Sequence, residues 1–148
     1  MSKPLQILLV EDNPQDAELT IHALKSCGLA DDLVHVRDGQ EALDFIFGTG
    51  AHAGRDVRQQ PRVVLLDLKL PKVDGIEVLR QIRSDERTKL LPVAVFTSSR
   101  EESDVRATYR LGVNSFVVKP VDFESFSQAV SSLGHYWLEW NESPPREP

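Results

Sequence analysis

The stretch VVLLDLKLPKVDG, residues 63–75, begins as a buried strand and ends as a tight turn. Four apolar residues lead directly to Asp67, and the turn sequence Pro-Lys-Val-Asp-Gly follows shortly after it. Burying a carboxylate without a partner costs several kcal/mol. The run therefore predicts a strand that delivers the Asp67 side chain to an edge of the fold, where other groups balance its charge.

Four other apolar runs of strand length surround this one, and segments with helical spacing alternate with them. Strands are expected at residues 5–10, 33–36, 62–67, 92–97 and 115–118. Helices are expected at residues 13–28, 38–47, 73–84, 99–112 and from 122 onward, with a long surface loop at 48–61. Continuous apolar runs are typical of a parallel sheet covered on both faces. Right-handed crossovers then predict an α/β fold, a doubly wound five-stranded sheet in a three-layer α/β/α sandwich.

The expected helices carry start and stop signals. Asn13 can cap the first helix, and Gly28 ends it. Ser99 and Glu102 form a capping-box pattern that opens the fourth helix. Asp122 starts the fifth.

Composition limits the class of protein. A chain of 148 residues fits one domain, and its content of 41% hydrophobic and 27% charged residues is ordinary for a soluble globular protein. No apolar run approaches the length of about 18 residues that spans a membrane. The acidic pair Glu11-Asp12 follows the first apolar run too soon for a secretory signal. Cys27 is the only cysteine, which favours a cytoplasmic location, and the net charge of −6 argues against a nucleic-acid partner.

Reactive side chains follow four of the expected strands at their carboxyl ends. The first strand ends in Glu11 and Asp12, the third in Asp67, the fourth in Thr97 and the fifth in Lys119. In doubly wound sheets the working site lies beyond these ends. Each residue alone has an ordinary explanation as a turn, cap or strand-end residue, but their joint placement predicts one shared site.

The chemistry of that set is specific. Three neighbouring carboxylates repel one another, and a divalent cation removes the repulsion. Mg²⁺ prefers oxygen ligands and keeps several waters. Lys119 supplies a mobile charge suited to a phosphoryl group, and Thr97 adds a hydroxyl donor. These features predict an aspartyl-phosphate site in which the charge is stabilised by metal and lysine.

Four motifs together resemble the receiver domain of two-component response regulators, over residues 4–133: LLVEDN, LLDLKLPKVDG, VFTSS and FVVKP. The resemblance implies the (βα)5 flavodoxin-like receiver fold. It also implies that Asp67 is the phosphoacceptor. Glu11, Asp12 and Asp67 would hold Mg²⁺ together with the backbone carbonyl of Lys69.

The same resemblance implies roles for the other residues at the carboxyl ends of the strands. Thr97, Ser98 and Lys119 would contact the phosphoryl oxygens. Lys69, two positions after Asp67, is expected to reach them as well. Thr97 and an aromatic residue on the last strand, here Phe116, would form the switch. Phe116 lacks the phenol found in many relatives. The bond between Lys119 and Pro120 is expected to be cis, as in the family.

A narrower resemblance concerns the insert and the tail. The stretches VEDNPQDAELTIHALK, RDGQEALDFIFGTG and HYWLEWNESPP are similar to the small stand-alone regulators paired with bacterial and cyanobacterial phytochrome kinases. This similarity implies that the phosphoryl group comes from the histidine of a phytochrome-type sensor histidine kinase.

The C-terminal segment carries a seam of large apolar residues. Residues 123, 126, 130, 133, 137 and 140 are spaced 3, 4, 3, 4 and 3 apart, as in a coiled coil. We therefore predict a homodimer through Phe126, Val130, Trp137 and Trp140, although residues 123–133 could instead pack on their own sheet. The expected division is a receiver domain at 1–133 and an extension at 134–148, whose end NESPPREP is expected to be disordered.

Other functions remain open at this point. A phosphorelay intermediate would pass the phosphoryl group to a second histidine protein. An aspartyl phosphatase usually carries an acid two positions after its nucleophile, where this chain has Lys69. A nucleotide-binding domain would need a G-x-G-x-x-G after the first strand, which is absent. The sequence therefore favours a signalling module over an enzyme that acts on outside substrates.

Overall fold

The computed structural model of the protein describes residues 5–145. Five parallel strands form one sheet in the order β2-β1-β3-β4-β5. The strands are β1 (Ile7–Val10), β2 (Leu33–Val36), β3 (Val63–Leu66), β4 (Val93–Thr97) and β5 (Ser115–Val118). The helices are α1 (Pro14–Ser26), α2 (Gly39–Phe47), η1 (Gly50–His52), α3 (Gly75–Ser84), α4 (Glu102–Arg110), α5 (Phe123–His135) and η2 (Tyr136–Trp140). The predicted α/β sandwich is confirmed.

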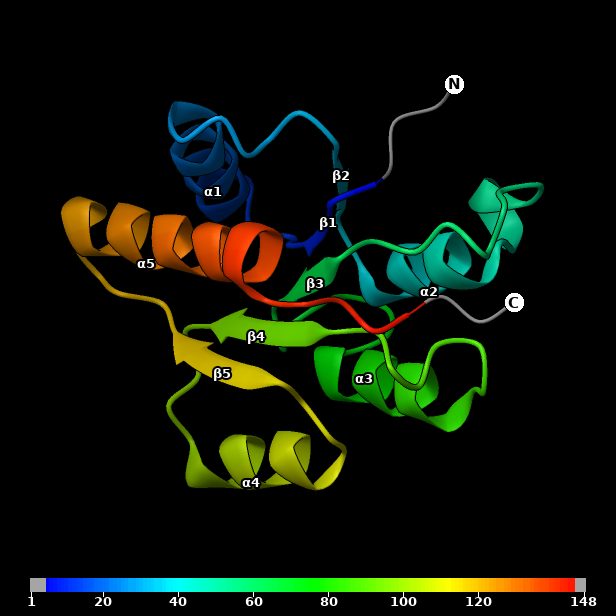
Figure 1. The fold of residues 1–148 in the computed structure, drawn as a ribbon. Helices are drawn as coiled ribbons and strands as arrows, with labels where there is room; N and C mark the ends of the chain where they lie inside the picture. The colour runs from blue at the N-terminus through cyan, green and yellow to red at the C-terminus, as the bar shows by residue number, and fades with distance from the viewer. Residues whose placement is uncertain (1–4, 146–148) are drawn as a thin grey trace.

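The sheet separates two hydrophobic cores, because side chains alternate along each strand. Helices α1 and α5 cover one face together, while α2 and α3, with α4 beside α3, cover the other (Figure 1). In β1, Ile7 and Leu9 join the first core, whereas Leu8 and Val10 join the second. All residues of β1, β3 and β4 are buried, which explains why the sequence shows continuous apolar runs. No helix in residues 5–145 has the length and apolar character needed to cross a bilayer.

The first helix cap is as predicted, but the fourth is not. The Asn13 side chain accepts hydrogen bonds from the backbone N–H groups of Gln15 and Asp16, and α1 begins at Pro14. Helix α4 begins only at Glu102, so Ser99 lies too early to cap it. The Ser99 hydroxyl instead donates to the Asp104 carboxylate at 2.6 Å. The predicted capping box of Ser99 and Glu102 is therefore wrong.

Helix α5 continues into the five-residue π-helix η2, and Gly134 near its end packs closely against neighbouring leucines. A Cβ on Gly134 would lie 2.8 Å from Leu24 and 2.9 Å from Leu29. A larger side chain here would require the tips of these two leucine side chains to move. The helix cost of glycine is therefore offset by packing between α1 and α5.

This packing corrects the predicted dimer interface. Phe126, Val130 and Trp137 are buried in the chain's own core, with 4%, 0% and 6% of their surface exposed. The apolar seam faces α1 and the sheet, so these three residues have no free surface for a second copy. Trp140 alone of the four predicted residues is on the outside, at 80% exposure.

Arg62 ties the C-terminal segment to the start of β3. Its guanidinium donates to the carbonyl oxygens of Leu138 at 2.7 Å and Asn141 at 3.1 Å. It also donates to the Ser143 hydroxyl at 3.1 Å. Residues 141–143 are thus held in place, in contrast to the disordered end expected from residue 141, and residues 146–148 lie outside the described range.

Replacing Arg62 by alanine is expected to lower the free energy of unfolding by about 2 kcal/mol, because three hydrogen bonds from one charged group are lost. The segment after α5 should become more sensitive to protease at the same time. Urea unfolding and limited proteolysis measure both effects. Arg58→Ala is the matched control, since Arg58 has an 87% exposed side chain and pairs with Asp56 in its own loop. Equal behaviour of the two variants would contradict the tethering role.

Candidate functional site

The carboxyl ends of four neighbouring strands bring the predicted residues to one rim. In the register of the sheet, Val10 lies beside Leu66, and Thr97 lies beside Val118. The residues that follow these positions therefore emerge at the same level. They are Glu11 and Asp12 after β1, Asp67 after β3, Ser98 after β4 and Lys119 after β5. Since β1 has β2 on one side and β3 on the other, this rim is also the point where the strand order reverses.

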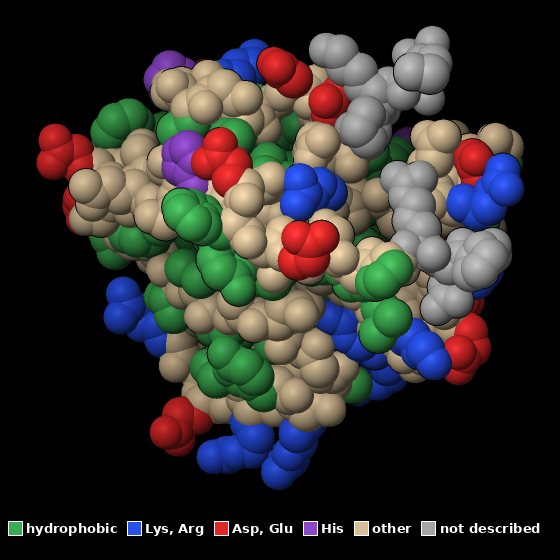
Figure 2. All heavy atoms as spheres, in the orientation of Figure 1, with side chains coloured by type: hydrophobic (Ala, Val, Ile, Leu, Met, Phe, Trp, Pro, Cys, Tyr) green, Lys and Arg blue, Asp and Glu red, His purple; other side chains and the backbone are tan. Residues whose placement is uncertain are grey.

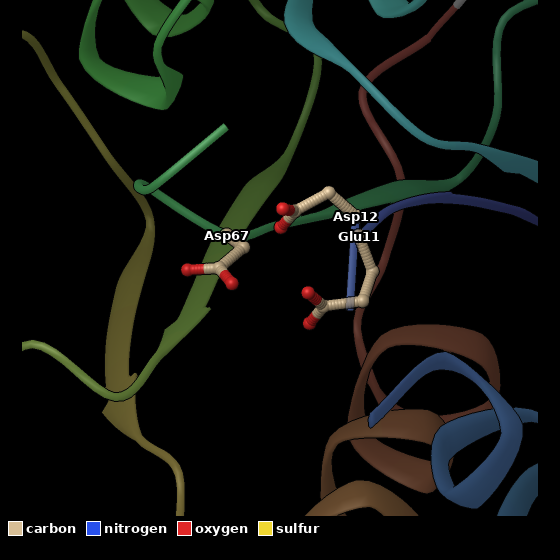
Figure 3. A group of neighbouring side chains, drawn as sticks. All are labelled: Glu11, Asp12 and Asp67. Carbon is tan, nitrogen blue, oxygen red and sulfur yellow. The ribbon is translucent and has the colours of Figure 1, made fainter. Parts of the chain in front are cut away.

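Three carboxylates meet at this rim. Glu11, Asp12 and Asp67 each have an oxygen within 4.8 Å of the oxygens of the other two. Figure 3 shows the three side chains close together, with those of Glu11 and Asp12 extending toward the side on which Asp67 lies. Glu11 and Asp67 are buried, with 2% and 6% exposure, whereas Asp12 is exposed. The group is therefore open to solvent on the Asp12 side.

The ammonium of Lys119 lies among carboxylates. Its Nζ donates to Glu11 Oε1 at 2.6 Å, to Asp16 Oδ2 at 2.8 Å and to Asp67 Oδ2 at 3.0 Å. The Lys119 side chain is 6% exposed, so these three partners supply its charge balance. Glu11, Asp67 and Lys119 were predicted from the sequence, whereas Asp16 was not. The missed signal was that α1 begins directly after the rim, so its first turn lies beside the site.

Burial dominates the electrostatics of Glu11. It raises the pKa of the Glu11 carboxyl from 4.5 to about 7, although the hydrogen bond from Lys119 acts in the opposite direction. The negative charge of Asp67 raises the Glu11 pKa further. Burial by itself lowers the pKa of Lys119, but the hydrogen bonds to Asp16 and Glu11 outweigh it, and the net pKa lies above the usual range. The rim therefore holds more negative charge than its buried environment favours.

This donor set fits a hard divalent cation. All three groups are carboxylates, and Mg²⁺ takes oxygen ligands. Burial raises the pKa of Glu11, and a cation bound at this place would favour the ionised form of the carboxyl. Lys69 lies at the edge of the same space, since its backbone N–H donates to Asp67 Oδ1 at 3.4 Å while its side chain is exposed.

The turn after β3 fixes the Asp67 carboxylate. The backbone N–H of Leu68 donates to Asp67 Oδ1 at 2.7 Å. Gly75 packs against the same backbone, because a Cβ there would lie 2.3 Å from the Asp67 carbonyl oxygen. Oδ1 is thus engaged by the backbone and Oδ2 by Lys119, so the orientation of the carboxylate is set before any ligand binds.

The fourth and fifth strands supply the remaining predicted residues. Thr97 is fully buried, and its hydroxyl accepts a hydrogen bond from the backbone N–H of Ser99 at 3.3 Å. Ser98 is exposed beside it. Phe116 is half-buried on β5 and packs against the core that contains α2 and α3.

The predicted cis bond between Lys119 and Pro120 is wrong for this structure. No peptide bond in residues 5–145 is cis. The trans form is the one that bonds before proline generally favour, by about 0.5–1 kcal/mol.

Residues 7–131 match the family described as the response regulator receiver domain. The chain belongs to this family. The order of the strands and the acidic rim of this receiver domain agree with that assignment. The family that was predicted from four sequence motifs is therefore confirmed.

Two curated relatives of this receiver domain are similar to it over most of their own length. The probable methanogenesis regulatory protein FilR2 of Methanothrix harundinacea is 45% identical over 141 residues, which cover 95% of this chain and 88% of FilR2. The response regulator Rcp1 of Synechocystis is 38% identical over 136 residues, which cover 92% of this chain and 90% of Rcp1.

Solved structures of similar receivers include two named for phytochrome signalling. The Mn²⁺-bound form of Rcp1 has a TM-score of 0.88 at 37% identity, covering 96% of this chain and 100% of that one. The phosphorylated cyanobacterial phytochrome response regulator RcpA has a TM-score of 0.88 at 36% identity, covering 97% and 100%. The bacteriophytochrome response regulator AtBRR has a TM-score of 0.70 at 51% identity, covering 95% and 100%.

Proposed function

We propose that this receiver domain accepts a phosphoryl group on Asp67 from the histidine of a sensor kinase, in a reaction that needs Mg²⁺. The observation that carries the proposal is the meeting of three carboxylates within 4.8 Å, with the Lys119 ammonium 3.0 Å from Asp67. In such surroundings the Asp67 carboxylate is a nucleophile placed beside the Lys119 ammonium and beside a site that suits a divalent cation. The similar response regulator Rcp1 has been solved in an Mn²⁺-bound form, which supports the proposal that a divalent cation takes part.

The reaction is a transfer between two side chains. An oxygen of the Asp67 carboxylate attacks phosphorus, the bond from phosphorus to the imidazole nitrogen breaks, and an acyl phosphate forms. The nitrogen keeps the electron pair of the broken bond. Mg²⁺ held by Glu11, Asp12, Asp67 and the Lys69 carbonyl would offset the negative charge of the phosphoryl oxygens.

The other rim residues are proposed to act on the phosphoryl group after transfer. Lys119 would move from its carboxylates to a phosphoryl oxygen, and the buried Thr97 hydroxyl and Ser98 would donate to others. Lys69 would reach the same group from the exposed side of the turn. Thr97 and Phe116 would form the switch, with Phe116 following the movement of Thr97.

We propose a phytochrome-type sensor histidine kinase as the phosphodonor. Support comes from the similarity to RcpA, a cyanobacterial phytochrome response regulator, and to AtBRR, a bacteriophytochrome response regulator. FilR2 is named as a probable methanogenesis regulatory protein instead, so a test of the phosphodonor should also include sensor kinases of other classes. With such a donor, we propose that the protein acts in the cytoplasm. We also propose that it catalyses only its own phosphorylation and dephosphorylation. Passing the phosphoryl group on to a second histidine protein is the alternative within signalling.

We further propose that the receiver spans residues 1–133, that 134–148 form an extension, and that two copies associate through its exposed part. Hydrophobic side chains gather over α5 and β5 on one face (Figure 2). Large exposed hydrophobic residues of the described chain include Leu90, Tyr136 and Trp140. Sedimentation at tens of micromolar would give the mass of two chains; the mass of one chain would refute the dimer.

The direct test of the proposed function is incubation of the wild-type protein with Mg²⁺ and acetyl phosphate, followed by mass analysis. We expect a gain of one phosphoryl group that disappears when a chelator removes the metal. Transfer from the autophosphorylated phytochrome kinase, compared with transfer from an unrelated kinase, then tests the partner. Absence of any phosphoryl gain in the presence of Mg²⁺ would overturn the proposal.

A further inference from the structure

One of the three carboxylates around Lys119 stands apart from the candidate metal group. Glu11 and Asp67 belong both to that group and to the contacts of Lys119. Asp16 contacts Lys119 at 2.8 Å but is not part of the metal group. The Asp16 side chain is also more open, at 29% exposure, than those of Glu11 and Asp67, at 3% and 8%.

Two cations would compete for the same oxygens at this rim. A divalent cation held by Glu11, Asp12 and Asp67 would draw on carboxylates that Lys119 also uses. The ammonium of Lys119 would be repelled by that cation, since like charges at short range disfavour each other. Lys119 is nevertheless buried and needs a counter-charge. Of the three carboxylates that contact Lys119, Asp16 is the one that the metal ion would not use, so it remains available as the counter-charge.

The start of α1 holds Asp16 in position for this task. Asn13 Oδ1 accepts a hydrogen bond from the Asp16 backbone N–H at 3.1 Å, and the Thr20 hydroxyl donates to the Asp16 carbonyl at 2.7 Å. Asp16 therefore lies in the first turn of the helix, where the aligned peptide dipoles favour a negative side chain. Its carboxylate is free to face Lys119 because the cap is already made by Asn13.

We propose that Asp16 is a positioning residue that holds the Lys119 ammonium when a metal ion takes Glu11 and Asp67. In this arrangement Asp16 draws the Lys119 ammonium away from Glu11 and holds it close enough to Asp67 to meet the phosphoryl group that this side chain receives. The proposal rests on the proposed function for the identity of the reaction. Its effect on metal binding can be measured without any phosphodonor.

The first test is a double-mutant cycle on Mg²⁺ affinity, measured by calorimetric titration. Asp16→Asn is expected to weaken Mg²⁺ binding about fivefold, because Lys119 then stays on Glu11 and Asp67. In a Lys119→Ala background the same change should alter the affinity by no more than about twofold, since the competing cation is gone. An equally large effect in that background would show that Asp16 acts on the metal directly and would overturn the proposal.

Matched variants keep the test decisive if Lys119→Ala does not fold. Asp16→Glu returns the carboxylate and should restore most of the lost Mg²⁺ affinity. Glu18→Gln removes one charge from the exposed side of the same helix and should leave the affinity within about twofold of wild type. Wild-type affinity in Asp16→Asn, or an equal loss in Glu18→Gln, would refute the positioning role.

A second readout separates this proposal from the proposed function. At saturating Mg²⁺, the rate of phosphorylation by acetyl phosphate should fall about tenfold in Asp16→Asn, because Lys119 is less well placed. If wild type gains no phosphoryl group while the Mg²⁺ cycle behaves as expected, the proposed function fails and the role of Asp16 in holding Lys119 stands. If wild type is phosphorylated and Asp16→Asn matches it in both affinity and rate, the role of Asp16 fails alone.

Discussion

Asp67→Asn is expected to abolish phosphoryl incorporation, with no mass gain detectable after incubation with Mg²⁺ and acetyl phosphate. An amide oxygen is a far weaker nucleophile than a carboxylate, and it cannot form a stable acyl phosphate. The change is also local. Asparagine has nearly the size of aspartate, its oxygen can still accept the hydrogen bond from Leu68, and Lys119 retains Glu11 and Asp16. The protein should therefore remain folded, which circular dichroism checks.

The control for this prediction is a second aspartate away from the rim. Asp31 is exposed in the turn before β2, so Asp31→Asn should gain the phosphoryl group as wild type does. A mass gain in Asp67→Asn equal to that of Asp31→Asn would show that another side chain is the acceptor. The assignment of Asp67 would then be wrong, whatever the family of the chain.

Trp137→Ala is expected to lower the free energy of unfolding by about 3–5 kcal/mol, the range for truncating a buried aromatic residue. Trp137 is 6% exposed and belongs to the core between the sheet, α1 and α5. Its ring also makes an edge contact with Tyr136 at 5.0 Å between centroids. Because the cavity forms inside one chain, the loss in urea unfolding should not depend on protein concentration.

Trp140→Ala provides the matched comparison, since the two tryptophans are three residues apart and differ in burial. Trp140 is 80% exposed, so its removal should change the stability of one chain by no more than about 0.5 kcal/mol. If association uses this surface, Trp140→Ala should instead weaken the dimer. A small effect of Trp137→Ala together with a large one of Trp140→Ala would contradict the packing described above.

Much of the rim was predictable because it depends on local features. An acid after an apolar run, such as Asp67, marks a strand end from the sequence alone. A parallel sheet then aligns these ends, so Glu11, Thr97 and Lys119 were expected near Asp67 without knowledge of the strand order. Cap residues such as Asn13 were predictable for the same reason, since the bonds that they make reach only two or three residues along the chain.

The missed features depend on contacts between distant segments. Asp16 meets Lys119 across 103 positions of the chain, and no spacing pattern in α1 distinguishes it from other acids of a first helical turn. The role of Arg62 was likewise not predicted from the sequence, because its guanidinium donates to the carbonyl oxygens of Leu138 and Asn141, more than 70 positions away along the chain. Side-chain reach over such separations is decided by how the helices lie on the sheet.

The apolar seam of the last helix was also only partly predictable from local sequence. Its 3 and 4 spacing determined that Phe126, Val130 and Trp137 share one face, and this is what the structure contains. The spacing could not determine what covers that face, because a coiled coil and a core helix bury the same stripe. In the structure α1 and the sheet cover it, and Gly134 packs close to Leu24 on α1 and to Leu29 just after it. The sequence by itself thus determined the fold class, the strand ends and the acids of the rim, whereas the tertiary structure decided which charges meet and which apolar surfaces remain exposed.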